Sequence, residues 1–117
     1  MTRYYAGTLA DIPATGGKIV SIKGMEIGLF RVRGQIVAWR NVCPHAGAPV
    51  CRGPVCGTRL PSLVYEYEYG MEHEVLRCPW HGWEFQLTNG EHLVDSSVKL
   101  RGFPVETEDD QVYVIMG

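Results

Sequence analysis

The chain has 117 residues, of which 45% are hydrophobic and 21% charged, and its formal net charge is −2 at pH 7. This length suits one domain with a modest core, and we expect a single module over residues 1–117. The slightly acidic balance provides no basic patch for phosphate groups, which argues against nucleic acid as a partner. We find neither a secretory signal nor an apolar run near the roughly 20 residues of a membrane helix, so we expect a cytoplasmic protein without a membrane partner.

The first third of the chain alternates apolar and polar residues, a pattern typical of β-strands rather than helices. Three such runs follow one another at residues 18–23, 26–33 and 35–40. Gly24 and Gly34 stand between them, where tight turns are needed. We therefore expect a meander of short antiparallel strands.

A second set of strands is predicted after residue 60. Residues 64–69 alternate Tyr and Glu with a period of two, and Gly70 follows them. We expect Gly70 to turn the chain into a further strand at residues 74–77, which makes an added hairpin beside the first set. Of two interpretations of the Tyr and Glu alternation, a surface for partner docking and an ordinary half-buried strand, we favour the half-buried strand.

The last third of the chain also shows strand patterns. A run at residues 83–87 leads to Asn89 and Gly90, and an Asn-Gly pair is the strongest short hairpin signal. Residues 103–106 and 111–115 supply a final strand pair. No segment has the periodicity of a helix, so the predicted fold is all-β, as a small antiparallel sandwich or barrel.

Two short loops carry the residues with metal-binding chemistry. The first loop (residues 41–49) contains Cys43 and His45, and the second loop (residues 78–83) contains Cys78 and His81. Two thiolates and two imidazoles suit zinc or an iron–sulfur centre rather than magnesium or calcium. Pro and Gly in both loops allow the backbone to wrap around a compact cofactor. Structural zinc accepts the same donors, although zinc fingers usually place their two cysteines together, whereas here each loop supplies one of each kind.

The sequences Cys-Pro-His-Ala-Gly-Ala-Pro and Cys-Pro-Trp-His-Gly-Trp-Glu-Phe resemble the two boxes of Rieske iron–sulfur proteins, especially ferredoxins and oxygenase N-terminal domains. The resemblance covers most of the chain. It implies a Rieske-like sandwich or barrel with the cluster-binding loops at one end. It also implies one Rieske-type 2Fe-2S cluster, with Cys43 and Cys78 on one iron and His45 and His81 on the other.

The same resemblance implies an electron-transfer component that has no catalytic residues or substrate site of its own. Such a ferredoxin takes one electron from a reductase and passes it to a terminal oxygenase or another redox enzyme. A small Rieske subunit of a nitrite reductase or oxygenase complex is an alternative, and a zinc-stabilised binding domain without a redox role is another.

The residues around the second box also indicate whether the reduction potential is high or low. Histidine ligation places Rieske centres at roughly −150 to +300 mV. By resemblance, the high-potential respiratory members carry a disulfide between the loops and hydroxyl donors after the second box. Here Trp80 stands where the disulfide cysteine would lie, and Trp83 and Phe85 offer no hydroxyl. We therefore predict a potential near the bottom of the range.

Other residues with possible metal or redox chemistry have simpler interpretations. Cys51 and Cys56 bracket a turn-like segment, and we expect free thiols packed near the cluster rather than a local disulfide or alternative ligands. His73 and His92 stand beside carboxylates, as in a mononuclear iron site, but are interpreted as solvated surface residues. The acidic residues 106–110 are interpreted as a soluble turn rather than a docking site for a basic partner.

Overall fold

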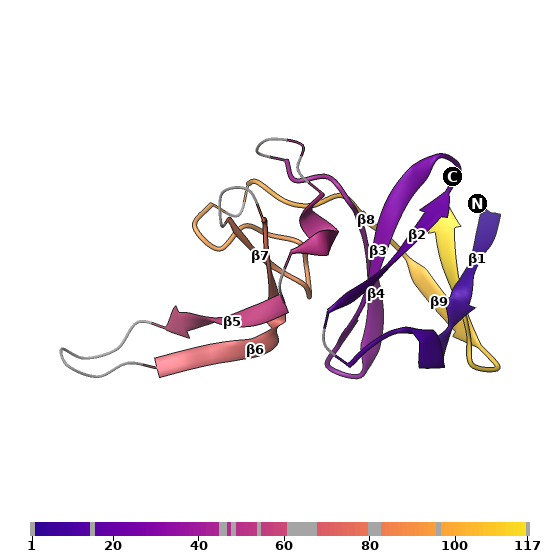
Figure 1. The fold of residues 1–117 in the computed structure, drawn as a ribbon, viewed down its shortest axis with the longest axis horizontal. Helices are drawn as coiled ribbons and strands as arrows, with labels where there is room; N and C mark the ends of the chain where they lie inside the picture. The colour runs from indigo at the N-terminus through magenta and orange to yellow at the C-terminus, as the bar shows by residue number, and fades with distance from the viewer. Residues whose placement is uncertain are drawn as a thin grey trace.

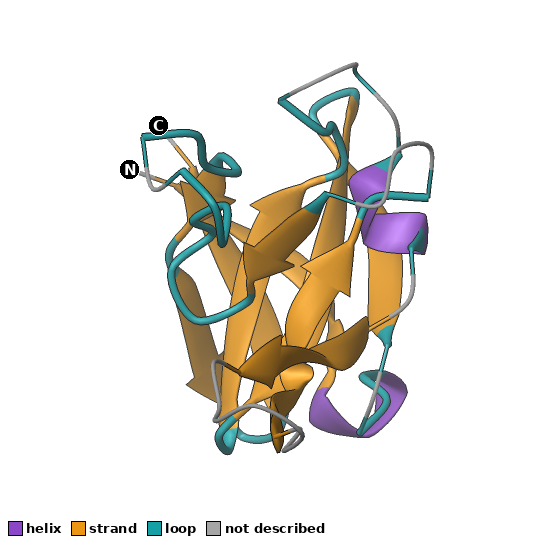
Figure 2. Ribbon diagram, turned by 90° about the vertical axis from the view of Figure 1, so that its left-hand side faces the viewer, coloured by secondary structure: helices purple, strands orange, loops and turns teal. Residues whose placement is uncertain are grey.

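The computed structural model describes residues 2–14, 16–44, 47, 49–53, 55–60, 68–79, 83–95 and 97–116, with the backbone alone for residues 56–60 and 68–74. The strands are β1 (Thr2–Thr8), β2 (Gly17–Ile22), β3 (Met25–Val32), β4 (Gln35–Arg40), β5 (Val55–Leu60), β6 (Glu68–Arg77), β7 (Glu84–Gln86), β8 (Gly102–Phe103), β9 (Val105–Glu108) and β10 (Gln111–Met116). Helical residues in this part of the chain are confined to two 3₁₀ turns, η1 (Leu9–Asp11) and η2 (Val50–Arg52) (Figure 2). The all-β prediction is confirmed.

The strands form three antiparallel sheets, with the orders β1-β10-β9, β2-β3-β4-β8 and β5-β6-β7. The predicted meander is β2-β3-β4, and the predicted final pair is β9-β10. Strand β1 pairs with β10 from Thr2 opposite Met116 onward, so the two ends of the chain lie side by side (Figure 1). The sequence patterns did not indicate β1.

The turns of the meander explain its tight hairpins. Lys23 and Gly24, between β2 and β3, have φ values of 53° and 78°. Arg33 and Gly34, between β3 and β4, repeat this with 50° and 76°. Positive φ at both central residues defines the type I′ turn, whose twist matches that of the flanking strands. The two glycines therefore stand at the predicted turn positions.

The middle sheet separates two hydrophobic cores, because β3 is buried on both of its faces. Ile27 and Leu29 belong to one core and Phe30 and Val32 to the other, as the period of two requires. The basal core, shared with the β1-β10-β9 sheet, consists of Ala6, Ile12, Ile22, Ile27, Leu29, Ala38, Val112, Val114 and Met116. The site-side core consists of Phe30, Val32, Trp39, Cys43, Val50, Cys51, Leu76, Cys78, Phe85, Leu87 and Leu100.

The structure corrects the prediction around Gly70. Strand β6 runs through Gly70 without reversing, and it pairs with β5, a strand that was not predicted. The chain keeps its direction at Gly70, while the pairing register changes between Cys56 and Thr58. The hairpin is therefore formed by β5 and β6, and Figure 1 shows it projecting from the rest of the molecule. Most of the Tyr and Glu alternation falls on residues 61–67, outside the described residues.

The chain reversal predicted at Asn89 and Gly90 is present. Gly90 has a φ of 77°, and its N–H donates to the carbonyl of Gln86 over 2.7 Å. The N–H of Gln86 in turn donates to the carbonyl of Glu91. The turn thus spans residues 87–90 rather than two residues alone.

The acidic stretch is only partly a turn. Glu106 and Glu108 belong to β9, and Asp109 and Asp110 make the turn to β10. The guanidinium of Arg3 on β1 lies 3.6 Å from Glu106 and 3.0 Å from Glu108. These exposed ion pairs link β1 to β9 across the β1-β10-β9 sheet. Glu106 and Glu108 therefore already have a basic partner within the chain.

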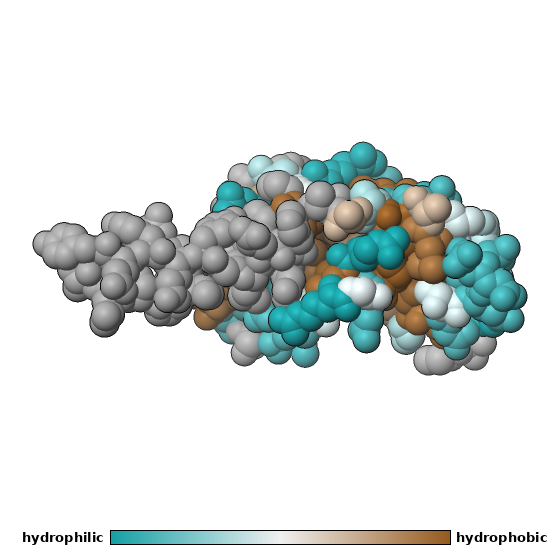
Figure 3. Space-filling view, turned by 90° about the horizontal axis from the view of Figure 1, so that it is seen from below, coloured by the Kyte–Doolittle hydropathy of each residue, from teal (hydrophilic) through white to brown (hydrophobic). Residues whose placement is uncertain are grey.

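The surface follows from the two-core arrangement. Seen from below, apolar atoms gather in the centre of the described part, between hydrophilic margins (Figure 3).

No helix of the described residues is long and apolar enough to cross a membrane.

Candidate metal centre

The first loop begins directly after β4. Cys43 is 1% exposed, and its carbonyl accepts a hydrogen bond of 2.8 Å from the N–H of Gly47. Gly47 has a φ of 73°, a conformation that costs an ordinary side chain about 1–2 kcal/mol. Gly47 therefore bonds back to Cys43 in a conformation that favours glycine. His45 lies outside the described residues.

The base of the first loop is fixed by the side chain of Asn41. The N–H of Cys51 donates to Asn41 Oδ1 over 2.7 Å. Asn41 Nδ2 donates to Glu26 Oε1 over 3.1 Å, and the Asn41 N–H donates to the Glu26 carbonyl over 2.9 Å. Asn41 is 5% exposed. One buried amide thus joins the start of the loop, the 3₁₀ turn that follows it, and strand β3.

Gly53 brings the end of this segment against the start of the second loop. A Cβ on Gly53 would overlap the carbonyl oxygen of Arg77 and would lie 3.2 Å from Pro79 Cδ. Arg77 and Pro79 flank Cys78. Because only a hydrogen fits there, η2 and the second loop pack backbone to backbone.

The second loop is the connection of the β6-β7 hairpin. Leu76 pairs with Phe85 and Arg77 with Glu84, and the Cys78 N–H then donates to the Trp83 carbonyl over 2.8 Å. A backbone hydrogen bond beyond the last paired residues of the ladder thus joins the two ends of the second loop. Cys78 is 1% exposed, and Pro79 is exposed. Trp80 and His81 lie outside the described residues.

The fold therefore brings the two predicted cysteine ligands into the same core. Cys43 and Cys78 both belong to the site-side core, although they come from loops far apart in the sequence. Within the described ranges, no group of three or more His, Cys, Asp or Glu side chains is arranged to hold a metal ion, and both predicted histidine ligands fall outside those ranges. Two buried thiols in an apolar setting fit a thiolate-bound centre.

Cys51 is distinct from these two cysteines. Its thiol is free and buried, and its Sγ lies 3.5 Å from the Trp39 carbonyl oxygen. Burial raises the pKa of Cys51 to about 12. Cys51 belongs to the site-side core and forms no disulfide, so it is a free packing thiol, as predicted. The side chain of Cys56 lies outside the described residues.

His92 is less solvated than the surface position predicted for it. Its ring is half-buried, with its centroid 4.5 Å from the Trp83 ring and 5.3 Å from the Phe85 ring. Its Nδ1 accepts a 3.3 Å hydrogen bond from the Asp95 N–H. The polar neighbours of His92 concealed this packing, because the strand bridge between Phe85 and His92 is what brings the rings together. The side chain of His73 lies outside the described residues.

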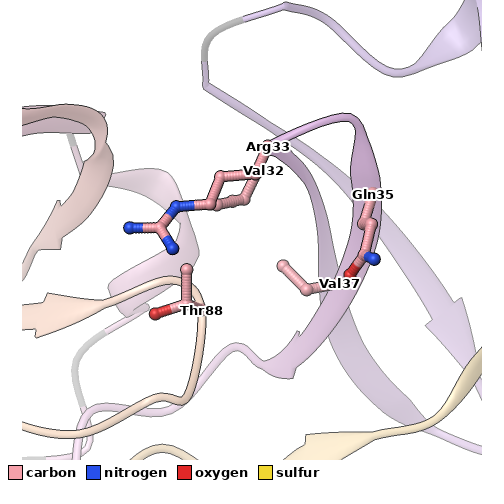
Figure 4. A pocket seen from close by; sticks show the side chains of 5 residues that line it. All are labelled: Val32, Arg33, Gln35, Val37 and Thr88. Atoms are coloured by element: carbon pink, nitrogen blue, oxygen red, sulfur yellow. The ribbon is translucent and has the colours of Figure 1, made fainter.

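A surface hollow of about 320 Å³ lies between the β3-β4 turn and the turn after β7. Figure 4 shows Arg33 reaching from the first of these turns toward Thr88 on the second, with Val37 and Gln35 on β4. Neither Cys43 nor Cys78 lines this hollow. It is therefore separate from the thiol site.

Comparison with known proteins agrees with the resemblance found in the sequence. The family model described as Rieske [2Fe-2S] domain matches residues 2–104. The ferredoxin component of the naphthalene 1,2-dioxygenase/salicylate 5-hydroxylase systems of Ralstonia sp. is 29% identical over 112 residues, covering 95% of this chain and 92% of its own length.

Two solved structures share the fold. The ferredoxin of carbazole 1,9a-dioxygenase from Nocardioides aromaticivorans IC177 superposes with a TM-score of 0.75 at 19% identity, covering 97% of each chain. A protein described as the NADH-dependent nitrite reductase small subunit of Mycobacterium tuberculosis gives 0.71 at 23% identity, covering 97% of this chain and 93% of its own. At these identities the structural likeness establishes the fold alone.

Proposed function

Because the chain belongs to the Rieske [2Fe-2S] domain family, we propose that its two loops hold one cluster between them, with Cys43 and Cys78 on one iron and His45 and His81 on the other. The observation that carries this assignment is the burial of both cysteines in the site-side core. The two histidines follow their cysteines at the spacing of the family's boxes. We also propose that residues 1–117 form one such domain.

The chain carries a Rieske-type 2Fe-2S cluster and acts as an electron carrier, as its family and its ferredoxin relative establish. Nothing in these comparisons supports the zinc-stabilised alternative. When bound, the cluster accepts and releases one electron, and the residues of this chain set the conditions for that step. Leu76 and Phe85 are fully buried beside Cys78 and exclude water from the thiolate side, whereas Pro44 and Pro79 lie exposed on the loops.

We propose that the reduction potential is low. Hydrogen-bond donors to the cluster sulfurs raise the potential of such centres. Phe85, which has no hydroxyl, is completely buried in the site-side core, and Trp83 packs against that core. These features support a potential near the lower limit of roughly −150 mV.

We propose that the chain passes electrons from a reductase to a terminal oxygenase in the cytoplasm. The support is the near full-length match to the ferredoxin component of a dioxygenase system. A role as the small subunit of a nitrite reductase is the second candidate, favoured by the structural likeness to a protein of that description. Stopped-flow kinetics distinguish these two roles. The rate at which a terminal oxygenase of the naphthalene type oxidises the reduced chain is compared with the rate for a nitrite reductase large subunit.

The ligand assignment is tested by spectroscopy and substitution. The purified protein should be brown, and dithionite should bleach its visible absorbance, whereas a zinc protein is colourless. The His81→Ala substitution should abolish the reversible redox signal. The matched control is His73→Ala, which removes a histidine outside both loops and should retain the signal. A reversible signal in the first variant, or its loss in the second, would refute the assignment.

A further inference from the structure

We propose that Asn41 is the positioning residue of the first loop and holds Cys43 where the cluster needs it. This inference rests on the proposed ligand role of Cys43. Asn41 is the one buried polar or charged side chain of the described residues, and it stands two positions before Cys43. A buried amide persists where its hydrogen bonds are made, and here both ends of the amide have partners.

The acceptor end of the amide closes the loop. Asn41 Oδ1 receives the N–H of Cys51 over 2.7 Å, which is short for a bond between neutral groups. Asn41 and Cys51 lie on either side of the segment that contains Cys43. One side-chain hydrogen bond therefore fixes the distance between the two ends of this segment.

The donor end fixes the closed loop to the middle sheet. Asn41 Nδ2 donates to Glu26 Oε1 over 3.1 Å, and the second carboxylate oxygen of Glu26 lies 3.6 Å from Arg52 Nη2. Arg52 belongs to η2, next to Cys51. Glu26 thus holds both ends of the loop, through Asn41 at the start and through Arg52 at the end.

This arrangement controls the position of Cys43 more than the stability of the whole chain. The basal core lies on the other face of the middle sheet and does not include Asn41. Loss of the amide leaves the buried N–H of Cys51 without its acceptor, a cost that is relieved if the loop opens toward water. The expected consequence is a displaced Cys43 thiolate in a chain that stays folded.

The test compares the holoprotein with Asn41→Ala, with Asn41→Asp, and with the double variant Asn41→Asp/Glu26→Gln. The double variant exchanges the donor and the acceptor, so the amide of the new glutamine can donate to the new carboxylate. The Val112→Ala variant is the control, since it weakens the basal core without contacting the first loop. The readouts are the electron paramagnetic resonance spectrum of the reduced cluster and the rate of bleaching by a chelator.

Asn41→Ala should change the spectrum and speed bleaching by roughly tenfold, the lower end of the effect seen when groups that orient metal ligands are removed. Val112→Ala should lower the unfolding midpoint and keep the wild-type spectrum. The double variant should recover the wild-type spectrum that Asn41→Asp loses, which also decides the matter if Asn41→Ala does not fold. A wild-type spectrum in Asn41→Ala, or no recovery in the double variant, would overturn the inference. Absence of a Rieske signal in the wild-type protein would instead refute the proposed function.

Discussion

The two ligand loops are held in place by different means. The first loop depends on side chains, because Asn41 bonds its base to Cys51 and to Glu26 on β3. The second loop depends on backbone, because the β6-β7 ladder continues into the hydrogen bond between Cys78 and Trp83. Backbone closure is available to almost any sequence that forms a hairpin, whereas side-chain closure requires particular residues. Substitutions around the first loop should therefore disturb the site more than equivalent ones around the second.

The largest effect is expected where the two loops touch. Gly53→Ala places a Cβ on the carbonyl oxygen of Arg77, so one of the two backbones must shift. Gly53 has an ordinary φ of −75°, so the effect is purely steric. We expect a loss of about 3 kcal/mol or more in the free energy of unfolding, at the upper end for overpacking.

Gly47→Ala is the matched control, since a Cβ there meets no atom of the described residues within 4 Å. The expected cost is that of the positive φ, about 1–2 kcal/mol. Urea unfolding of both variants compares the two costs. A smaller loss for Gly53→Ala than for Gly47→Ala would show that the loops do not pack as described.

The second largest effect is a pH dependence of stability that comes from the buried thiol of Cys51 in η2. The pKa of Cys51 is raised by burial from 9.0 in the unfolded chain to about 12. Below pH 9 both states keep the thiol proton, and the stabilisation is fully present. Between pH 9 and about 12 only the unfolded state releases the proton, so stability is lost as the pH rises, by up to about 1.4 kcal/mol per pH unit.

Unfolding free energies measured at pH 8 and pH 10 for the wild type and Cys51→Ala isolate this contribution. The wild type should lose more stability over this interval than the variant does. Equal losses in the two proteins would mean that the Cys51 thiol is accessible to water.

The smallest effect is expected beside the second loop. Arg77 and Glu84 form a 3.0 Å ion pair across the last rungs of the β6-β7 hairpin, and the arginine side chain is 47% exposed. Exposed pairs contribute at most about 1 kcal/mol. Arg77→Gln should therefore lower the unfolding free energy by less than that and leave the spectrum of the reduced cluster unchanged. A spectral change as large as that of Asn41→Ala would remove the distinction between the loops.

Most of the fold was predictable because its signals are local. The strands of the meander alternate along the chain, and Gly24 and Gly34 mark their turns directly. The two boxes were equally clear, since a compact cofactor needs particular ligands at short spacings. These features depend on residues that are neighbours in the sequence.

The features that escaped prediction depend on distant partners. Strand β1 has only Ala6 buried, and its pairing partner β10 lies at the other end of the chain. Strand β5 contains Gly57 beside a change of register, which weakens its alternation. In the sequence Gly70 indicates a turn. In the structure it lies within β6, because Thr58 of β5 pairs with it. The role of Asn41 and the packing of His92 likewise become visible only when Cys51 and Trp83 are placed beside them.

The most direct test of the central claim is a potentiometric titration of the wild-type protein, followed by the paramagnetic resonance signal of its reduced state. A Rieske cluster held by two cysteines and two histidines, without hydroxyl donors from Trp83 or Phe85, should titrate as a one-electron centre near the lower limit of roughly −150 mV. A midpoint above roughly +150 mV, well inside the upper part of the Rieske range, would contradict the account.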